Sequence, residues 1–329
     1  MKEDDIRPAH LRVKVQELFR KEAKALLAYA SEFVEVACPA CAEGAPEIYL
    51  QKDGYQYKRC RKCRTAYVSP RPTPELLKQY YAKNEAAHFW QKEVFPRTRQ
   101  ARTEGIYKAR ADLIQKVVAE CKGETNSFMD VGAGSGIFGQ EIARRRIFKT
   151  VYLVEPGPIP LKNTATFRVI QDSIENVELS EAVDFITNFE LIEHLFSPED
   201  FLRKIHSLLS GGAFFLFSTP NLEGFELLTV HDKSPNLAGP DHLTLFNPDS
   251  IRVLLDRTGF NALRVWTPGE LDCDIVRNKH LEGVLDLKTD PFLYHILIER
   301  PESHMAPFQI FLKENNLSSH MMVLARKKS

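Results

Sequence analysis

A short apolar run that leads directly into alternating glycines constrains the fold of this chain more than any other feature. Residues 128–131 read Phe-Met-Asp-Val, and Gly132, Gly134 and Gly136 follow at every second position. The apolar run predicts a buried strand, and the glycines permit positive φ and a close approach of backbone N–H groups to a ligand. Residues 137–146 then have the pattern of a helix. The segment therefore predicts a strand, a tight ligand-binding turn and a helix.

The glycines by themselves leave two classes of cofactor open. Gly134, Gly136 and Gly139 also satisfy the dinucleotide-binding pattern, and Glu155 lies at about the spacing of its ribose-binding acid. Asp130 separates the two classes, because a carboxylate at the strand end would repel a pyrophosphate and attract a cationic cofactor. S-adenosylmethionine carries an ammonium and a sulfonium and has no phosphate, so it fits this loop better than NAD.

With Asp130 before the glycines, the segment resembles the cofactor loop of class I S-adenosylmethionine-dependent methyltransferases. Downstream, apolar runs alternate with helical patterns, which is typical of a doubly wound parallel sheet. The expected strands are residues 151–154, 167–170, 183–187 and 213–217, and the expected helices are 198–209 and 248–257. The resemblance implies a Rossmann-like α/β fold with a mostly parallel seven-stranded sheet. It also implies that residues 262–266 and 320–325 form the last two strands as a hairpin at the sheet edge.

The resemblance carries several cofactor contacts onto this sequence. Glu155 closes the second strand, where a carboxylate can accept both ribose hydroxyls. Asp172, followed by Ser173, corresponds to the acid that binds the adenine amino group, although a plain turn aspartate explains it as well. Asn188 and Glu190, after the fourth strand, border the methionine moiety. The predicted cofactor-binding residues are Asp130, Gly132, Gly134, Gly136, Glu155, Asp172, Ser173, Asn188 and Glu190.

The segment from Glu190 to His194 permits a second hypothesis. Its E-x-x-E-H arrangement, with Glu193 as the second acid, resembles that of ubiquinone-biosynthesis O-methyltransferases, where it is associated with a divalent metal. Oxygen and imidazole ligands suit magnesium, manganese or zinc. The same segment also borders the methionine end of the pocket in relatives without a metal. His194 is in addition a secondary candidate for a catalytic base.

The main candidate for a catalytic base is His242. It lies between the fifth strand and the following helix, and histidine accepts a proton near neutral pH. Its neighbour Asp241 could orient the imidazole or stabilise its charged form. The segment resembles the acid-histidine motif of deoxysugar C-methyltransferases, in which the histidine is the base. The competing interpretation is a histidine that only hydrogen-bonds within its loop.

Four cysteines predict a structural metal site. Cys38 and Cys41 form one C-x-x-C pair, and Cys60 and Cys63 form a second pair after eighteen intervening residues. This spacing is typical of a zinc ribbon, in which two turns present four thiolates tetrahedrally. Four protein ligands close the coordination shell, so the zinc is expected to stabilise the module rather than take part in catalysis. Cys121 and Cys273 are expected to be ordinary buried thiols.

A zinc ribbon ahead of a methyltransferase domain resembles two families with different substrates. Nucleotide-deoxysugar C-methyltransferases use the module to cover the sugar, although their large third domain is not expected in this sequence. Some ribosomal RNA methyltransferases use such a module to grip RNA. Five basic residues around Cys60 either face solvent or engage phosphates, namely Lys58, Arg59, Arg61, Lys62 and Arg64.

Composition weighs against nucleic acid and membrane partners. Lysine plus arginine and aspartate plus glutamate number 44 each, so the chain has no net basic field for gathering phosphates. No run approaches the roughly 18 apolar residues of a membrane span, and the N-terminal residues are charged. A cytoplasmic protein is expected. Its expected domains are an N-terminal helix (1–35), a zinc-ribbon module (36–72) and a methyltransferase domain (73–329) with an insertion at about 267–318 that could shape a substrate pocket.

The predicted function is methyl transfer from S-adenosylmethionine to a small polar acceptor, a sugar or nucleotide-linked sugar of glycan or secondary-metabolite biosynthesis. Three alternatives stay open at this point. The first is a methyltransferase that binds ribosomal or transfer RNA through the zinc ribbon. The second is a quinone-type small-molecule O-methyltransferase, and the third is a non-catalytic scaffold that binds the cofactor. The sequence does not determine the oligomeric state or the acceptor atom.

Overall fold

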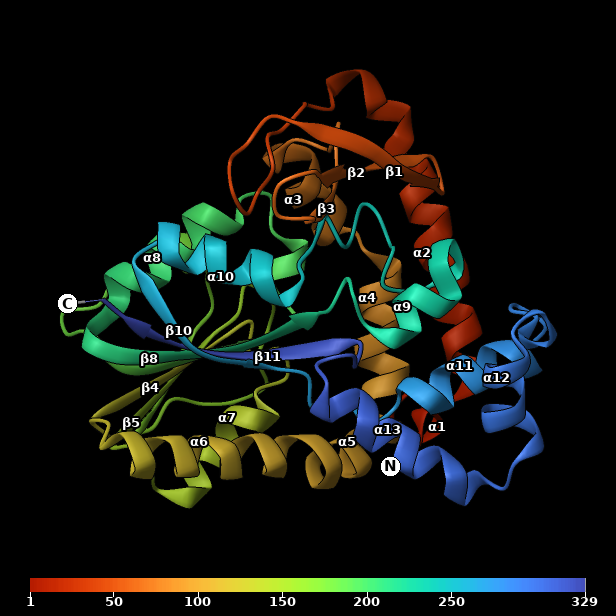
Figure 1. The fold of residues 1–329 in the computed structure, drawn as a ribbon. Helices are drawn as coiled ribbons and strands as arrows, with labels where there is room; N and C mark the ends of the chain where they lie inside the picture. The colour runs from red at the N-terminus through yellow and green to blue at the C-terminus, as the bar shows by residue number, and fades with distance from the viewer. Residues whose placement is uncertain (329) are drawn as a thin grey trace. The chain divides into compact units, whose positions relative to one another are not determined.

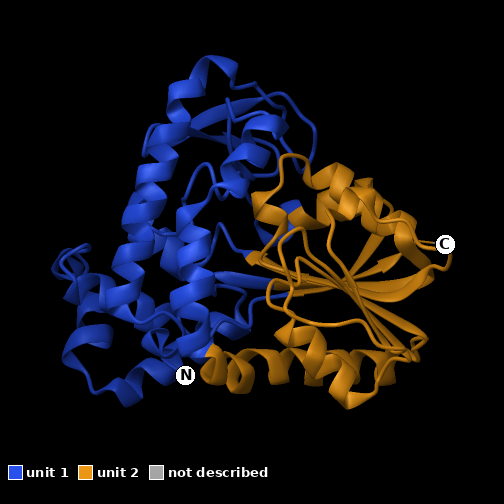
Figure 2. Ribbon diagram, turned by 180° about the vertical axis from the view of Figure 1, so that it is seen from behind, with its two compact units in different colours: residues 1–98, 220–250, 266–321 blue, residues 99–219, 251–265, 322–329 orange. Residues whose placement is uncertain are grey.

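The computed structural model describes residues 1–328, which divide into two compact units (Figure 2). Unit 1 comprises residues 1–98, 220–250 and 266–321, and unit 2 comprises residues 99–219, 251–265 and those from 322 onward. Each unit is thus assembled from segments that are far apart in the sequence. The linear domain boundaries predicted near residues 35 and 72 stay a prediction, since the compact units do not follow the chain in order.

Unit 2 contains a seven-stranded sheet with the strand order β10-β11-β8-β7-β4-β5-β6. The strands are β4 (Ser127–Val131), β5 (Thr150–Val154), β6 (Phe167–Ile170), β7 (Val183–Phe189), β8 (Leu209–Pro220), β10 (Phe260–Trp266) and β11 (His320–Lys327). From β6 to β8 all neighbouring strands are parallel. This order and direction confirm the predicted Rossmann-like fold, including the adjacent final strands at the sheet edge.

The helices of unit 2 cover both faces of this sheet. Figure 1 shows α6 (Lys108–Cys121) and α7 (Ile137–Arg145) on one face, with α8 (Pro198–Leu208) and α10 (Pro248–Arg257) on the other. Helices on both sides explain why β7 is buried along nearly its whole length rather than at alternate residues. Aromatic rings fill the interior, and the Phe128 ring lies 5.2 Å from that of Phe148 and 6.2 Å from that of Phe185.

Unit 1 contains a smaller sheet with the order β1-β2-β3-β9. The strands are β1 (Pro46–Lys52), β2 (Tyr55–Cys60), β3 (Ala66–Val68) and β9 (Thr244–Leu245). Asp53 and Gly54 both have positive φ in the turn between β1 and β2, as a two-residue hairpin turn of type I′ requires. This Asp-Gly signal was present in the sequence, although only the cysteine pairs were used to predict the module. β9 comes from the distant second segment of the unit and pairs antiparallel with β3.

Helices form the remainder of unit 1. They are α1 (Glu3–Ile6), α2 (Ala9–Leu26), α3 (Pro74–Ala82), α4 (Glu85–Phe89), α9 (Phe225–Val230), α11 (Asp272–Leu281), α12 (Pro291–Tyr294) and α13 (Met305–Glu314), and α5 (Phe95–Arg102) crosses into unit 2. Thr73 caps α3, since its hydroxyl accepts the Leu76 N–H. The predicted insertion at 267–318 is mostly helical. None of the helices in residues 1–328 is both long and apolar enough to cross a membrane.

Two local predictions are corrected by the structure. The helix expected to reach Leu209 ends at Leu208, and β8 begins at Leu209, because the backbone of Leu209 is already extended, with φ of −79° and ψ of 143°. Cys121 was expected to be buried, but it is exposed at the last residue of α6, whereas Cys273 is buried.

Candidate functional site

The glycine loop of unit 2 joins the end of β4 to the start of α7. Gly132, Gly134 and Gly136 have φ of +72°, +53° and +75°, values that side chains with a Cβ rarely adopt. A Cβ built on Gly134 would meet no atom within 4 Å, so this residue faces open space. Gly136 is the N-cap of α7 and provides no side-chain cap, which leaves the first backbone N–H groups of the helix available to a ligand. The loop therefore offers backbone donors beside an open surface, as a bound cofactor requires.

Glu155 lies directly after β5, next to this loop. Its carboxylate accepts the Gly134 N–H at one oxygen and the Gly157 N–H at the other, both at 3.0 Å. Two backbone donors thus fix the plane of the carboxylate, while each oxygen keeps a second lone pair for a ligand. The position is the carboxyl edge of a parallel sheet, where ligands of open α/β folds bind. The carboxylate is therefore suited to accept from two neighbouring hydroxyl groups.

Asp130 is the last residue but one of β4, just before the glycines, and is only 4% exposed. Burial raises the pKa of Asp130 to about 7, whereas the hydrogen bond from the Thr187 hydroxyl, at 2.8 Å, and the nearby Arg110 guanidinium oppose this rise. Arg110, on α6, lies 3.9 Å from the centre of the Phe189 ring, and burial lowers its pKa. The sequence analysis did not identify Arg110, because helical periodicity alone gives no sign that α6 faces the strand ends.

Asp172 and Ser173 form a turn after β6. The Asp172 carboxylate accepts the Ser173 N–H at 2.7 Å and the Asn176 amide at 2.9 Å, and these bonds lower its pKa. Ser173 also donates a short hydrogen bond to Glu175. Since Asp172 is exposed, it can accept a further donor, so an adenine contact at this residue stays a prediction.

Asn188 lies at the end of β7, beside Val131 of β4. It is fully buried, and within residues 1–328 neither its amide nitrogen nor its carbonyl oxygen has a hydrogen-bond partner. A buried amide without partners costs free energy, so these atoms require water or a ligand. This observation supports a bound group near the carboxyl end of β7.

Of the three predicted ligands of a second metal, Glu193 and His194 lie close together. Glu190 has a φ of +55°, and its carboxylate accepts the Ser218 hydroxyl at 2.5 Å. Glu193 is fully buried, bonds the Thr219 hydroxyl at 2.9 Å, and lies 3.9 Å from the His194 ring. Burial, followed by the charge of Glu190, raises the pKa of Glu193 to about 7. Among residues 1–328, Glu193 and His194 lie close enough together to share an ion, whereas Glu190 is not grouped with them. A divalent metal held by all three residues stays a prediction.

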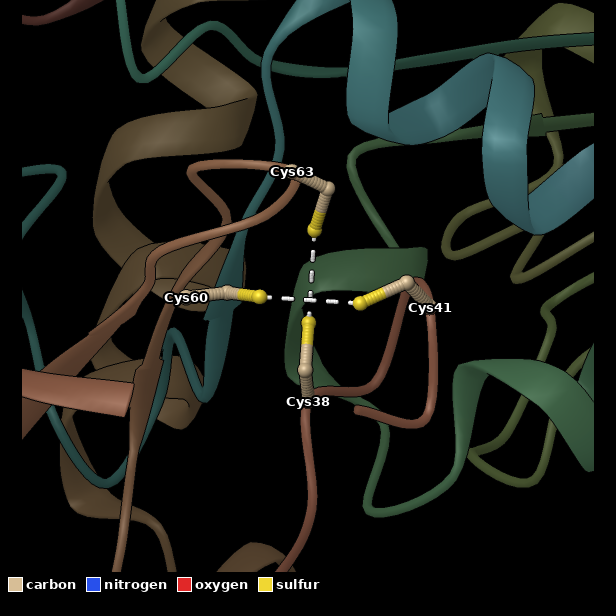
Figure 3. Close-up of side chains that lie close together, drawn as sticks. All are labelled: Cys38, Cys41, Cys60 and Cys63. Carbon is tan, nitrogen blue, oxygen red and sulfur yellow. Dashed lines mark hydrogen bonds between the residues drawn. The ribbon is translucent and has the colours of Figure 1, made fainter. Parts of the chain in front are cut away.

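The four predicted zinc ligands do converge, in unit 1. Figure 3 shows the four cysteine side chains pointing toward a common centre. Their sulfur atoms lie within 4.8 Å of one another, with Cys38 to Cys63 and Cys41 to Cys60 both at 3.5 Å. Tetrahedral coordination at a zinc–sulfur distance of about 2.3 Å separates the sulfurs by about 3.8 Å. The donor set and its spacing therefore fit zinc, with no coordination position left for a substrate.

His242 and Asp241 lie in unit 1, beside β9. The His242 ring nitrogen Nδ1 is 2.9 Å from the Asn236 carbonyl oxygen, and the Tyr57 hydroxyl donates to the His242 carbonyl at 3.2 Å. Both residues line a cavity of about 520 Å³ within unit 1. Other residues that line it are Phe19, Arg20, Lys52, Asp53, Lys279 and Val284, the last two from the insertion. The cavity thus combines both signs of charge with one aromatic ring.

Comparison with known proteins decides the family. Residues 99–265, about half of the chain, match the family described as "Methyltransferase domain". The chain belongs to the methyltransferase-domain family. Membership confirms the predicted methyltransferase domain. The matched region includes the glycine loop, Glu155, Asp172 and the segment from Asn188 to His194.

Several relatives of this methyltransferase-domain chain are curated. A ubiquinone biosynthesis O-methyltransferase of Acinetobacter baylyi is 29% identical over 105 residues, which cover 28% of this chain and 43% of the relative. A probable S-adenosylmethionine-dependent methyltransferase of Mycobacterium tuberculosis is 31% identical over 93 residues, covering 28% of this chain and 32% of the relative. This chain thus matches less than half the length of these relatives. Among solved structures, the 1,6-didemethyltoxoflavin-N1-methyltransferase of Burkholderia thailandensis has a TM-score of 0.49 and 13% identity, covering 87% of this chain and 100% of that one.

The basic residues around Cys60 are mostly paired with other residues of unit 1. Lys62 contacts Glu43 at 2.8 Å, Arg64 contacts Glu223 at 3.1 Å, and Arg61 contacts Glu47 at 3.4 Å. Lys58 bonds Glu35, and the Arg59 guanidinium lies 5.6 Å from the Tyr49 ring centre. These neighbours compete with any phosphate, so they favour a solvated, self-neutralised face over an RNA-binding surface.

Proposed function

We propose that this protein transfers the methyl group of S-adenosylmethionine to a small polar acceptor, a sugar or a nucleotide-linked sugar. The observation that carries the proposal is the Glu155 carboxylate, held by the N–H groups of Gly134 and Gly157 beside an open glycine loop. A carboxylate aligned in this way suits a ribose diol. Family membership adds the class of reaction.

In this proposal the residues of unit 2 hold the cofactor. Glu155 accepts the ribose hydroxyls, Asp172 the adenine amino group, and Asp130 faces the cationic methionine end. Arg110 provides a cation for the methionine carboxylate, and the orphan amide of Asn188 provides a donor and an acceptor. Bound S-adenosylmethionine supplies an electrophilic methyl group, so the protein's main task is alignment of the acceptor.

The residues of unit 1 bind the acceptor and remove its proton. The cavity beside His242 has charged side chains of both signs, which suit a polyhydroxylated, charged molecule better than an apolar one. A sugar hydroxyl must lose its proton as it is methylated, and His242 is the proposed base, with Asp241 beside it and His194 as the secondary candidate. The four-cysteine cluster holds zinc as a structural ion. Such a site needs reduced thiols, which favours the predicted cytoplasmic location.

The cofactor assignment is tested by replacing Glu155. Glu155→Ala should weaken S-adenosylmethionine binding by roughly 10- to 100-fold, because a charged hydrogen bond to the ribose is lost. Titration calorimetry measures this affinity, and the exposed Glu181 on the same unit provides a matched control, Glu181→Ala. Wild-type protein that binds NAD and not S-adenosylmethionine would falsify the assignment.

The catalytic assignment is tested by replacing His242. His242→Ala should lower kcat by about 100-fold or more and leave the cofactor affinity unchanged, since a base acts on the acceptor proton. Single-turnover assays with a panel of nucleotide sugars measure the rate. An acceptor that the wild-type protein methylates must be found before the variant is compared with it. Normal turnover by the variant would remove His242 from the mechanism.

A second candidate function is O-methylation of a quinone-type phenol. The similarity to ubiquinone biosynthesis O-methyltransferases favours it, although the mixed charge of the cavity does not. Including catechol and prenylated phenol acceptors in the same panel separates the two functions. Binding of the cofactor without transfer to any acceptor would instead favour a scaffold, and salt-sensitive retention on RNA would favour the RNA alternative.

A further inference from the structure

The hydrogen bond at Nδ1 selects one tautomer of His242. The Asn236 carbonyl oxygen, 2.9 Å from Nδ1, can only accept a hydrogen bond. In the neutral imidazole Nδ1 must therefore carry the proton, which leaves the lone pair on Nε2. The ring nitrogen at which His242 can accept a proton thus depends on where the Asn236 carbonyl points.

Asn236 is itself held by two further hydrogen bonds. Its backbone N–H donates to the Ser234 hydroxyl at 3.1 Å, and its side-chain amide donates to the Glu226 carboxyl at 2.8 Å. Ser234 is fully buried and Glu226 is 1% exposed, so both partners are fixed parts of the interior of unit 1. A residue bound at its N–H, its side chain and its carbonyl has little freedom to rotate its peptide plane.

Glu226 is an unusual residue to find in this interior. It lies on α9, and its own backbone N–H donates to the Ser319 hydroxyl at 3.1 Å. Burial raises the pKa of Glu226, against the hydrogen bonds from Ser234 and Asn236, and its second carboxyl oxygen has no hydrogen-bond partner within residues 1–328. Burying a carboxyl group of this kind costs folding free energy, so its presence favours a role that an apolar residue could not fill.

We propose that Glu226 is a positioning residue, which acts through Asn236 to keep His242 in the tautomer with its lone pair on Nε2. The inference rests on the proposed role of His242 as the base. Glu226 touches neither cofactor nor acceptor in this role. It accepts the Asn236 amide in either protonation state, so glutamine at this position can make the same contact.

The experiment compares Asn236→Ala, Glu226→Ala and Glu226→Gln with the wild-type protein. Asn236→Ala keeps the backbone carbonyl but cuts the link to Glu226, and Glu226→Ala cuts it from the other side. Long-range proton–nitrogen spectra of histidine-labelled protein report which ring nitrogen carries the proton, and the signal lost in His242→Ala identifies His242. Both alanine variants should show mixed tautomers and a kcat lowered on the order of 10-fold, with unchanged S-adenosylmethionine affinity.

Glu226→Gln should restore the single tautomer and most of kcat. The proposal is overturned if the alanine variants keep the wild-type tautomer, or if glutamine is as damaging as alanine. If Glu226→Ala does not fold, which loss of cofactor binding would show, the proposal is tested by the tautomer and kcat of Asn236→Ala alone. The alanine and glutamine variants could give the expected spectra while His242→Ala turns over normally. That result would contradict the role of His242 as the base but would still support the contact that positions its ring.

Discussion

At the scale of single residues, the structure separates predicted contacts that are fixed from those that still await a ligand. Glu155 was found from its place after a strand, and its two backbone donors show why that place matters. Arg110 could not be found in this way, because its approach to Phe189 depends on how α6 packs on the sheet. The same holds for Glu226, whose role comes from a contact with Asn236 that no periodic pattern reveals.

The raised pKa of Asp130 leads to a prediction about pH. Without cofactor the carboxyl keeps its proton up to about pH 7, whereas a cationic ligand favours the ionised form. Binding should therefore release a proton below about pH 7, and affinity for S-adenosylmethionine should rise with pH through that range, by up to about tenfold per pH unit. Calorimetry in two buffers of different ionisation enthalpy measures the proton release.

Asp130→Asn is the control for this prediction. The asparagine can still accept the Thr187 hydroxyl but cannot ionise, so the variant should bind more weakly at pH 8 and lose most of the pH dependence. An unchanged pH dependence in Asp130→Asn would assign the released proton to another group, of which Glu193 is the first to examine, because burial also raises its pKa.

At the scale of elements, the cysteine module and the His242 loop form one structure. The β3 residue Val68 donates its N–H to the Leu243 carbonyl at 2.9 Å, and the Arg71 side chain donates to the same carbonyl at 3.2 Å. On the other side, the Asn247 side chain donates to the Cys63 carbonyl at 3.0 Å. The module thus supports the strand that follows His242, a function that the C-x-x-C spacing alone does not suggest.

Removal of zinc should therefore destabilise residues beyond the cysteine segment. Chelation, or Cys63→Ser, should increase hydrogen exchange in residues 38–68 and also in residues 242–247, because β9 depends on β3 for its pairing. Exchange in β4 and β7 of unit 2 serves as the internal control. Faster exchange confined to the cysteine segment would show that β9 is held by other contacts, and metal analysis of the purified protein that found no zinc would remove the assignment.

At the scale of the whole molecule, the sheet of unit 2 was predicted well from the sequence. Which segments of the chain come together in unit 1 was predicted less well. Parallel strands buried on both faces produce continuous apolar runs, so their bounds are visible in the sequence, and β6 and α10 lie where they were expected. The pairing of β9 with β3 joins two residues to a strand far upstream, and such short strands carry almost no periodic signal. The cavity beside His242 could not be predicted either, because α2, the β1–β2 turn and the insertion that line it are far apart in the sequence.

The pairing of β9 with β3 also bears on how the chain folds as it is made. The hairpin of β1 and β2 and the adjoining β3 contain only neighbouring residues, so they can form soon after residue 68 has been synthesised. β3 then remains an open sheet edge until Thr244 and Leu245 have been added, after most of unit 2 has been translated. An open edge can pair with another chain, so during this interval β3 exposes nascent molecules to aggregation.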